Sequence, residues 1–251
     1  MKLNFEFEEG FLDKKNILVT GASKGIGREI ALGLSKFGAN VILHGRSEDE
    51  LDEIYDEIIS KYKTDPMIIK CDLNLLDEDK SKEIVEVISK NISCLDGIIN
   101  NAAIIGRMSS IGDFDLDTWQ KVLNTNLTSS FLLVKYLSPL MENSERPRII
   151  FTSSGVASKG KAFWGAYAIS KAAVKSLSEI LQEELEPLSK IKVFNFDPGA
   201  TRTSMRAYAY PAEDPSSLKG TSSLLNYYLW FFSRESENID SRYIKYNIPS
   251  S

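Results

Sequence analysis

The sequence predicts a single α/β domain: a doubly wound parallel sheet of about seven strands with helices on both faces. Short apolar runs alternate with longer amphipathic segments along most of the chain. The short runs are apolar throughout rather than at every second residue, which is typical of parallel strands buried on both faces. Repeated strand–helix alternation implies right-handed crossovers. Because the 251 residues contain no internal repeat and no Gly/Ser-rich linker, we expect one domain over residues 1–251.

The individual elements follow from these patterns in chain order. Residues 1–14 are expected to form a short N-terminal extension. Residues 200–220 have no clear period, and so long a loop in a compact domain is usually functional or disordered. The apolar residues 224–232 are too few to span a bilayer and are predicted to be a packed helix face. Predicted strands are 16–20, 40–44, 66–70, 95–100, 147–153 and 191–196, and predicted helices are 25–37, 47–62, 77–91, 115–142 and 164–188.

Composition and charge exclude several classes of function. A net charge of −5 gives no reason to expect nucleic acid or an anionic membrane as a partner. Cys71 and Cys94 are too few for a disulfide framework. Residues 1–16 form an acidic segment without the apolar core of a secretion signal. We therefore expect a cytoplasmic protein. His44 is the only histidine, which leaves too little material for a histidine-based nucleophile system or a His/Cys zinc site. We therefore expect no metal.

A glycine-rich loop joins the first predicted strand to the first predicted helix. Gly21, Gly25 and Gly27 stand where the chain must turn tightly and where backbone must approach a ligand closely. The N-terminus of the following helix offers unpaired N–H groups and a positive dipole to a pyrophosphate. The spacing G-x-x-x-G-x-G differs from the dinucleotide pattern G-x-G-x-x-G. Its place after the first strand nevertheless favours a Rossmann-type nucleotide site over a purely structural turn.

The end of the second predicted strand indicates which dinucleotide binds. In such folds a carboxylate near this point takes the ribose hydroxyls of NAD, whereas an arginine accommodates the 2′-phosphate of NADP. Here the strand is followed by Gly45 and Arg46, with no acid at its end, and Lys24 in the glycine loop adds a second cation. The sequence therefore favours NADP. The alternative is that both cations are solvated surface residues.

The segment YAISK places Tyr167 and Lys171 four residues apart on a predicted helix, where they are neighbours. A free phenol has a pKa of about 10, and an ammonium group beside it favours the phenolate, which lowers that pKa. Alternatively, Tyr167 is a core residue and Lys171 extends to solvent. Ser154 ends one predicted strand and residues 197–203 follow another. Both therefore reach the edge at which parallel sheets bind ligands.

Together these motifs resemble the classical short-chain dehydrogenase/reductase family over nearly the whole chain. TGASKGIG, CDL, NNAA, NTNL, SSG, YAISK and PGATRT occur in the family's order and at its spacing. The resemblance implies a catalytic tetrad of Asn126, Ser154, Tyr167 and Lys171. WGAYAISK and PGATRTSMRAYAYPAEDP further resemble the bacterial YciK-type reductases. The implied nucleotide contacts are Gly21, Ser23, Lys24, Gly25, Ile26, Gly27, Arg46, Asp72, Leu73, Asn101, Ala102, Tyr167, Lys171, Pro198, Gly199, Thr201 and Thr203.

The resemblance implies hydride transfer between the nicotinamide of NADP(H) and a carbonyl or carbinol carbon. Tyr167 would exchange the proton with the substrate oxygen, and Ser154 would hydrogen-bond that oxygen. Lys171 would lower the pKa of the tyrosine and hold the ribose. Asn126 would fix a kinked main chain and a water. On the alternative interpretation Ser154 is a strand-end cap and Asn126 a buried amide that satisfies backbone groups.

Two other classes of function compete with a carbonyl reductase or alcohol dehydrogenase. A nucleotide-binding sensor or scaffold of the same fold would carry the same residues without turnover. A sugar-nucleotide epimerase or dehydratase usually has a longer chain with a second substrate domain, which this sequence does not provide. Because the family usually associates through the helices predicted at 115–142 and 164–188, we expect a homodimer or homotetramer with a small-molecule substrate.

The sequence departs from the family at two places. Ala103 stands where the family often has glycine, and the tail SRYIKYNIPSS lacks the usual D-G-G ending, which leaves the last strand open.

The substrate side of the predicted site is rich in aromatic residues. Arg202 and Arg206 either recognise an acidic group or face water, and we favour water. An aromatic pocket for a medium-sized carbonyl compound, or alternatively a packed lid, is indicated by Phe163, Trp164, Met205, Tyr208 and Tyr210.

Overall fold

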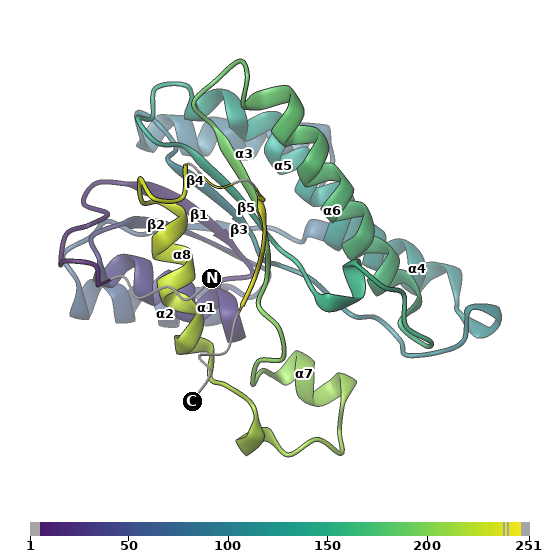
Figure 1. The fold of residues 1–251 in the computed structure, drawn as a ribbon. Coiled ribbons are helices and arrows are strands. Elements are labelled where there is room, and N and C mark those ends of the chain that lie inside the picture. The colour runs from purple at the N-terminus through teal and green to yellow at the C-terminus, as the bar shows by residue number, and fades with distance from the viewer. Residues whose placement is uncertain (1–5, 238, 240, 247–251) are drawn as a thin grey trace.

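A computed structural model describes residues 6–237, 239 and 241–246 (Figure 1). Seven strands of the described chain form one parallel sheet in the order β3-β2-β1-β4-β5-β6-β7. The order runs outward from β1 in both directions, as in a doubly wound fold. The strands are β1 Asn16–Thr20, β2 Asn40–Gly45, β3 Met67–Lys70, β4 Gly97–Asn100, β5 Arg148–Thr152, β6 Lys192–Asp197 and β7 Tyr243–Lys245.

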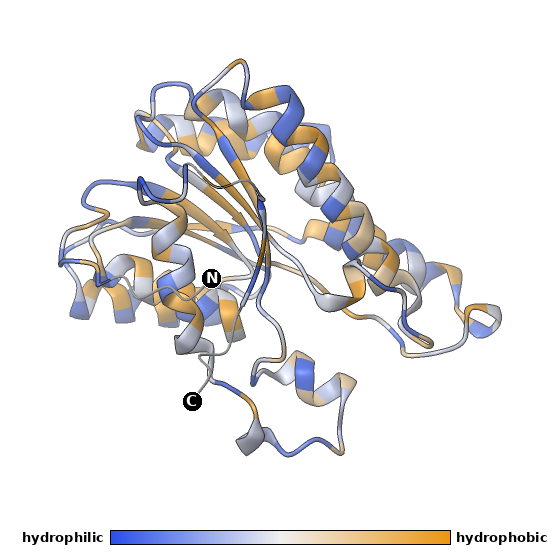
Figure 2. Cartoon of the chain, in the orientation of Figure 1, coloured by the Kyte–Doolittle hydropathy of each residue, from blue (hydrophilic) through white to orange (hydrophobic). Residues whose placement is uncertain are grey.

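Helices cover both faces of this sheet. On one face α1 (Gly25–Lys36), α2 (Glu48–Lys61) and α8 (Leu225–Phe231) pack with one set of strand side chains. On the other, α3 (Glu78–Asn91), α5 (Ser129–Leu137) and α6 (Gly165–Leu185) pack with the opposite set. Figure 2 shows apolar residues concentrated on the central strands. Within the described chain, none of the helices has the length and apolar character needed to cross a bilayer.

The predicted fold class is confirmed, and the predicted elements match the observed ones closely. Within the segment 115–142, α4 (Leu116–Leu123) passes into a π-helical turn, Asn124–Thr128, before α5 begins. The loop 200–220 contains α7 (Ser204–Ala209), which the sequence pattern did not predict. The last strand, β7, pairs with β6 even though the tail lacks the family's usual ending. Its pattern is too short to identify from sequence.

The N-terminal extension contributes to the core. Leu12 is buried against the cluster that α1 forms with the sheet, and Phe7 and Phe11 pack against the same cluster. The first five residues of the predicted extension, and the end of the tail at 247–251, lie outside the described residues.

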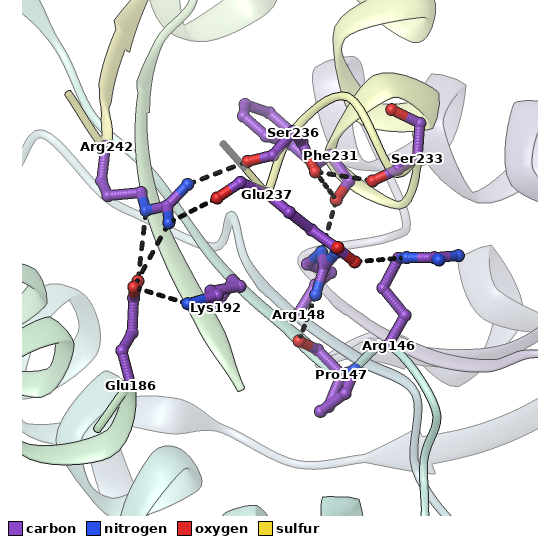
Figure 3. A network of polar contacts seen from close by, with 10 residues as sticks. All are labelled: Arg146, Pro147, Arg148, Glu186, Lys192, Phe231, Ser233, Ser236, Glu237 and Arg242. Atoms are coloured by element: carbon purple, nitrogen blue, oxygen red, sulfur yellow. Dashed lines mark hydrogen bonds and ion pairs between the residues drawn. The ribbon is translucent and has the colours of Figure 1, made fainter. Parts of the chain in front are cut away.

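A buried arginine at the start of β5 holds the end of α8 and the segment that follows it (Figure 3). Arg148, at the start of β5, is only 1% exposed, and burial lowers its pKa to about 10. Its Nε donates to the Phe231 carbonyl oxygen at 2.7 Å, and its Nη1 donates to the Pro147 carbonyl oxygen at 3.1 Å. Its Nη2 lies 3.0 Å from a Glu237 carboxylate oxygen, which also accepts from Arg146 Nε at 2.6 Å. The guanidinium charge is therefore both hydrogen-bonded and compensated, as burial of a charge requires.

A second arginine extends this network to β7 (Figure 3). Arg242 donates to the carbonyl oxygens of Ser236 at 2.8 Å and Glu237 at 3.0 Å. It also pairs with the carboxylate of Glu186, which Lys192 approaches to 3.0 Å. These contacts join the end of α6, the start of β6 and the chain entering β7. They explain how a strand of three residues, Tyr243–Lys245, keeps its place at the edge of the sheet.

We expect Glu237→Gln to lower the free energy of unfolding by about 1–2 kcal/mol, because it leaves the buried Arg148 guanidinium without its counter-charge. The partial exposure of the carboxylate keeps this loss below that of a fully buried pair. Urea denaturation followed by circular dichroism measures the change. The exposed Glu183→Gln on α6 serves as the control for loss of one negative charge. Equal stability of the two variants would contradict a stabilising role for this pair.

Candidate active site

The carboxyl ends of the strands open onto a cavity of about 540 Å³. Parallel sheets bind ligands at this edge, where loops from several strands meet. Of the predicted site residues, Gly27 and Asn126 do not line the cavity but lie behind its wall. The predicted residues that line it are Gly21, Ser23, Lys24, Gly25, Ile26, Arg46, Asp72, Leu73, Asn101, Ala102, Ser154, Tyr167, Lys171, Pro198, Gly199, Thr201 and Thr203.

The glycine loop forms a cradle that side chains would fill. Gly21 has a φ of +67°, and a Cβ at this position would lie 3.0 Å from the Cα of Ala102. A Cβ at Gly27 would lie 2.1 Å from the Gly21 carbonyl oxygen. Lys24 stands at the N-cap of α1 without a side-chain cap hydrogen bond, and the first turn of α1 carries no acid. The positive end of α1 is therefore available to an anion.

One threonine hydroxyl joins the ends of β1 and β4. Thr20 Oγ1 accepts from the backbone N–H groups of Asn101 at 2.9 Å and Ala102 at 3.0 Å, and it donates to the Ile99 carbonyl oxygen at 3.2 Å. The Asn101 side-chain amide returns a hydrogen bond to the Thr20 carbonyl oxygen at 3.0 Å. These bonds satisfy backbone groups that leave the sheet ladder at the point where the cavity begins.

Asn126 holds the wall behind the cavity from within the π-helical turn. Its Oδ1 accepts from the N–H of Ile104 at 2.8 Å, and its Nδ2 donates to the Ile104 carbonyl oxygen at 3.0 Å and to Ser170 Oγ at 3.0 Å. A π-helical turn inserts an extra residue into a helix and often occurs at functional sites. Here it directs the Asn126 amide toward the loop after β4 and toward α6. The geometry matches the buried-amide interpretation and also accounts for the kink expected at this residue.

Tyr167 and Lys171 both point into the interior from the first turns of α6. Lys171 Nζ donates to the Thr152 carbonyl oxygen at 2.7 Å and lies 5.9 Å from the centroid of the Tyr167 ring. Both side chains are buried, so the interpretation in which Lys171 extends to solvent is wrong. Ser154 makes no side-chain cap hydrogen bond, which argues against the strand-end cap, and it is close enough to Tyr167 to lower the pKa of the phenol.

The electrostatics of this group differ from the expectation. Burial raises the pKa of Tyr167 to about 12, the hydrogen bond to Ser154 opposes that rise, and the charge of Asp197 adds to it. Burial also lowers the pKa of Lys171 to about 8. The expected lowering of the tyrosine pKa by Lys171 is therefore wrong for this structure, because loss of hydration outweighs any attraction between the two groups. The ammonium group faces the Thr152 carbonyl rather than the phenol oxygen.

The comparisons with known proteins agree with this geometry. The sequence profile of the family described as short chain dehydrogenase matches residues 15–214. The chain belongs to that family. It is 35% identical to the oxidoreductase YciK of Escherichia coli strain K12 over 234 residues, which cover 93% of this chain and 92% of that protein.

Two solved short-chain dehydrogenases superimpose on nearly the whole structure. One, from Escherichia coli CFT073 and complexed with NADPH, has a TM-score of 0.91 at 35% identity and covers 95% of this chain and 99% of its own. The other, from Shigella flexneri 2a strain 301 and complexed with NADP, has a TM-score of 0.91 at 34% identity with the same coverage.

In this short-chain dehydrogenase the first half of the segment 200–220 forms part of the cavity wall. Thr203 caps α7 by accepting from the N–H of Arg206 at 3.1 Å. The Tyr208 hydroxyl donates to the Gly106 carbonyl oxygen at 3.2 Å, and Lys161 Nζ donates to the Tyr210 hydroxyl at 2.7 Å. The Tyr210 ring lies 5.7 Å from the ring of Trp164, centroid to centroid. Of the residues predicted here, Trp164, Met205 and Tyr210 line the cavity. Phe163 and Tyr208 do not line it and are exposed.

The two arginines of this segment differ. Arg202 is exposed, as favoured from sequence. Arg206 is half-buried and paired rather than free in solvent: both its Nε and its Nη2 lie 2.6 Å from Glu213 carboxylate oxygens, and its guanidinium lies 3.7 Å from the Tyr210 ring centroid. The expectation for Arg206 was wrong because its partner, Glu213, comes close only when the loop folds back.

Sequence reasoning also missed a lysine at the base of this loop. Lys219 Nζ donates to the Ala200 carbonyl oxygen at 2.6 Å, and its backbone forms a bridge with Thr201. Burial lowers the pKa of Lys219 to about 8, an effect that the charge of Asp197 opposes. Asp197 also accepts from the N–H of Gly199 at 2.9 Å. The loop thus begins and ends on one polar cluster, which a pattern search along the chain could not find.

We expect Thr20→Val to lower the free energy of unfolding by about 1–2 kcal/mol, because the isosteric change removes the acceptor of the Ala102 N–H, whereas the Asn101 N–H keeps the Ile99 carbonyl oxygen at 3.0 Å. Thr20→Ser retains the hydroxyl and should recover most of this loss. Chemical denaturation of both variants measures the difference. If valine and serine proved equally stable, the hydroxyl would not hold the ends of β1 and β4 together.

Proposed function

We propose that this short-chain dehydrogenase is an NADP(H)-dependent oxidoreductase that transfers hydride between nicotinamide and a carbonyl or secondary alcohol. The observation that carries the proposal is the convergence of the Tyr167 hydroxyl, the Ser154 hydroxyl and the Lys171 ammonium group in the cavity that the glycine loop also lines. The fold, the family and the NADP-containing structures of similar proteins support it.

The residues around the cavity fit NADP(H). The cradle at Gly21 and Gly27 and the uncapped start of α1 suit a pyrophosphate. Lys24 and Arg46 line the cavity where an NAD-binding protein would have a carboxylate at the end of β2, which suits a 2′-phosphate. Asp72 and Leu73 would receive the adenine. The nicotinamide end would lie at the loop Pro198, Gly199, Thr201 and Thr203.

In the direction of reduction, Tyr167 would donate the proton. A pKa of about 12 keeps its hydroxyl protonated at neutral pH, so the group begins as an acid. The proton of Tyr167 would go to the carbonyl oxygen, and a bound nucleotide would supply the hydride that the carbonyl carbon needs to become an alcohol. Ser154 would donate a hydrogen bond to the same oxygen as negative charge develops on it. Burial strengthens both interactions because water does not compete for them.

Lys171 and Asn126 would act beside this pair. The Lys171 ammonium group would hold a ribose hydroxyl of the nucleotide with the donors that remain after its bond to Thr152. Asn126 would act as a positioning residue, because its amide fixes the loop around Ile104 that forms one wall.

The walls of the cavity favour an uncharged substrate of medium size. Ile104, Ile105, Val156, Trp164 and Met205 present apolar surface to it. Arg206, the cation on α7, is paired with Glu213 and therefore offers an acidic substrate no free counter-charge. An apolar cavity with a few convergent polar groups is typical of sites for small organic molecules.

The same proposal includes a cytoplasmic homodimer or homotetramer. The free thiols of Cys71 and Cys94 suit a reducing compartment. Exposed Phe131 on α5 and exposed Ile169 and Ile180 on α6 are large apolar side chains on the helices through which association is expected.

Tyr167→Phe should lower kcat/KM for carbonyl reduction by about 10²–10⁴-fold, because it removes the proton donor and little else. A panel of neutral aldehydes and ketones with NADPH, followed by absorbance of the reduced nicotinamide, measures the loss. Binding of NADPH, followed by its fluorescence, should persist in the variant.

Two outcomes of that experiment would contradict the proposal. Unchanged turnover in Tyr167→Phe would mean that another group donates the proton. Tight binding of NADPH without turnover of any carbonyl or alcohol by the unaltered protein would favour a nucleotide-binding sensor or scaffold.

The rate of reduction should fall as the pH rises through about 8. The buried Lys171 is protonated below its pKa of about 8 and neutral above it, whereas Tyr167, with a pKa of about 12, stays protonated throughout this range. A profile of kcat/KM from pH 6 to 10 should show one descending limb. Lys171→Met should be slower by about 10²-fold at pH 7 and should lack that limb. If Lys171→Met still showed the descending limb at the same pH, the limb would belong to a group other than Lys171.

A further inference from the structure

A carboxylate lies among the cations that suit a 2′-phosphate. Glu50 Oε1 lies 2.6 Å from Lys24 Nζ. The hydrogen bond from Lys24 holds the pKa of Glu50 below its usual range, and a hydrogen bond from Ser23 and the charge of Arg46 act in the same direction. Ser23, Lys24 and Arg46 all line the cavity. Glu50 therefore pairs with Lys24 and lies near enough to Ser23 and Arg46 to act on the same group of side chains that would hold a phosphate.

The fold fixes this arrangement from the side of α2. Ser47 caps α2 by accepting from the Glu50 N–H at 3.5 Å, so the Glu50 side chain leaves from the first turn of the helix. Glu48, in the same turn, pairs with Lys70 of β3 and so faces away from the glycine loop. Acids in the first turn also stabilise a helix through its dipole, so Glu50 has a structural role that a test must separate from a role in binding.

We propose that Glu50 competes with the 2′-phosphate for Ser23, Lys24 and Arg46, and that it thereby sets how strongly the protein prefers NADP(H) to NAD(H). The inference rests on the proposed function, since it concerns the same nucleotide site. The phosphate carries more negative charge than the carboxylate and displaces it from these donors. When the cofactor lacks the phosphate, the carboxylate stays in place and can accept from the ribose 2′-hydroxyl, as the acid at the end of β2 does in NAD-binding folds.

The exposure of the pair makes displacement easy. The side chains of Lys24 and Glu50 are 67% and 34% exposed, and ion pairs this accessible to water contribute little free energy. The free energy needed to displace the Glu50 carboxylate from Lys24 therefore weakens NADP(H) binding by a modest factor and does not prevent it. Removal of the carboxylate should strengthen the binding of NADP(H) without strengthening that of NAD(H), which a purely structural role would not do.

The test compares nucleotide binding by the unaltered protein, Glu50→Gln and a matched control, Glu53→Gln. Glu53 is exposed on the same helix, so the control loses the same charge without a contact to the glycine loop. Dissociation constants for NADPH and NADH are measured by nicotinamide fluorescence at fixed ionic strength. Glu50→Gln should bind NADPH about two- to fivefold more tightly, and NADH equally or more weakly. Glu53→Gln should leave the ratio of the two constants unchanged.

A second pair of probes removes the nicotinamide from the comparison. Adenosine 2′,5′-bisphosphate and AMP differ only in the 2′-phosphate, and calorimetry measures both. Glu50→Gln should increase the affinity for the bisphosphate alone. Thermal unfolding of each variant reports separately any loss of helix stability.

The outcomes distinguish this inference from the proposed function. If the dissociation constants changed equally in Glu50→Gln and Glu53→Gln, the effect would come from long-range charge alone and the inference would be overturned. The proposed function would still stand if NADPH supported turnover. Weaker NADPH binding in Glu50→Gln would likewise overturn it. If the unaltered protein bound neither NADPH nor the bisphosphate, the proposed function and the inference would both fail.

Discussion

The burial of Lys171 against the main chain of β5 is the interaction on which the candidate site depends. An ammonium group in the interior is costly unless it is hydrogen-bonded, and here the Thr152 carbonyl oxygen is its acceptor at 2.7 Å. That bond sets α6 in register with the end of β5. Tyr167 belongs to α6 and Ser154 follows the end of β5 by two residues, so this hydrogen bond helps to bring their hydroxyls to the same cavity.

The same burial explains why sequence reasoning found the residues but gave the wrong sign for the tyrosine pKa. The spacing of Tyr167 and Lys171 on a helix is visible in the sequence, whereas their hydration depends on segments distant along the chain. Trp164 and Met205 pack in the same apolar cluster as Tyr167 and exclude water from it. Desolvation acts on each group separately and moves both toward neutrality, which keeps the phenol protonated and weakens the cation.

Other parts of the fold show the same division between local and distant information. The strands β1 to β6 and the helices between them were predictable because burial on two faces, or on one stripe, leaves a periodic pattern in consecutive residues. The glycine loop was predictable because each glycine answers a local steric demand. Partners such as Thr20 with Asn101, or Arg148 with Phe231, are separated by 81 and 83 residues. No pattern along the chain connects them, and only the folded sheet does.

The charges around the cavity point to the chemistry of its centre. Two of the cations that line it are compensated within the described chain, Lys24 by Glu50 and Arg206 by Glu213. Lys171, deeper in the site, has a carbonyl rather than a carboxylate as its partner. Beside α7, where Arg206 is paired, the cavity thus presents little free charge, and the hydroxyls of Tyr167 and Ser154 line the same cavity. Because water is largely excluded there, those donors stabilise negative charge that develops on an oxygen during the reaction. A substrate that is already charged gains less, because it must first lose its hydration.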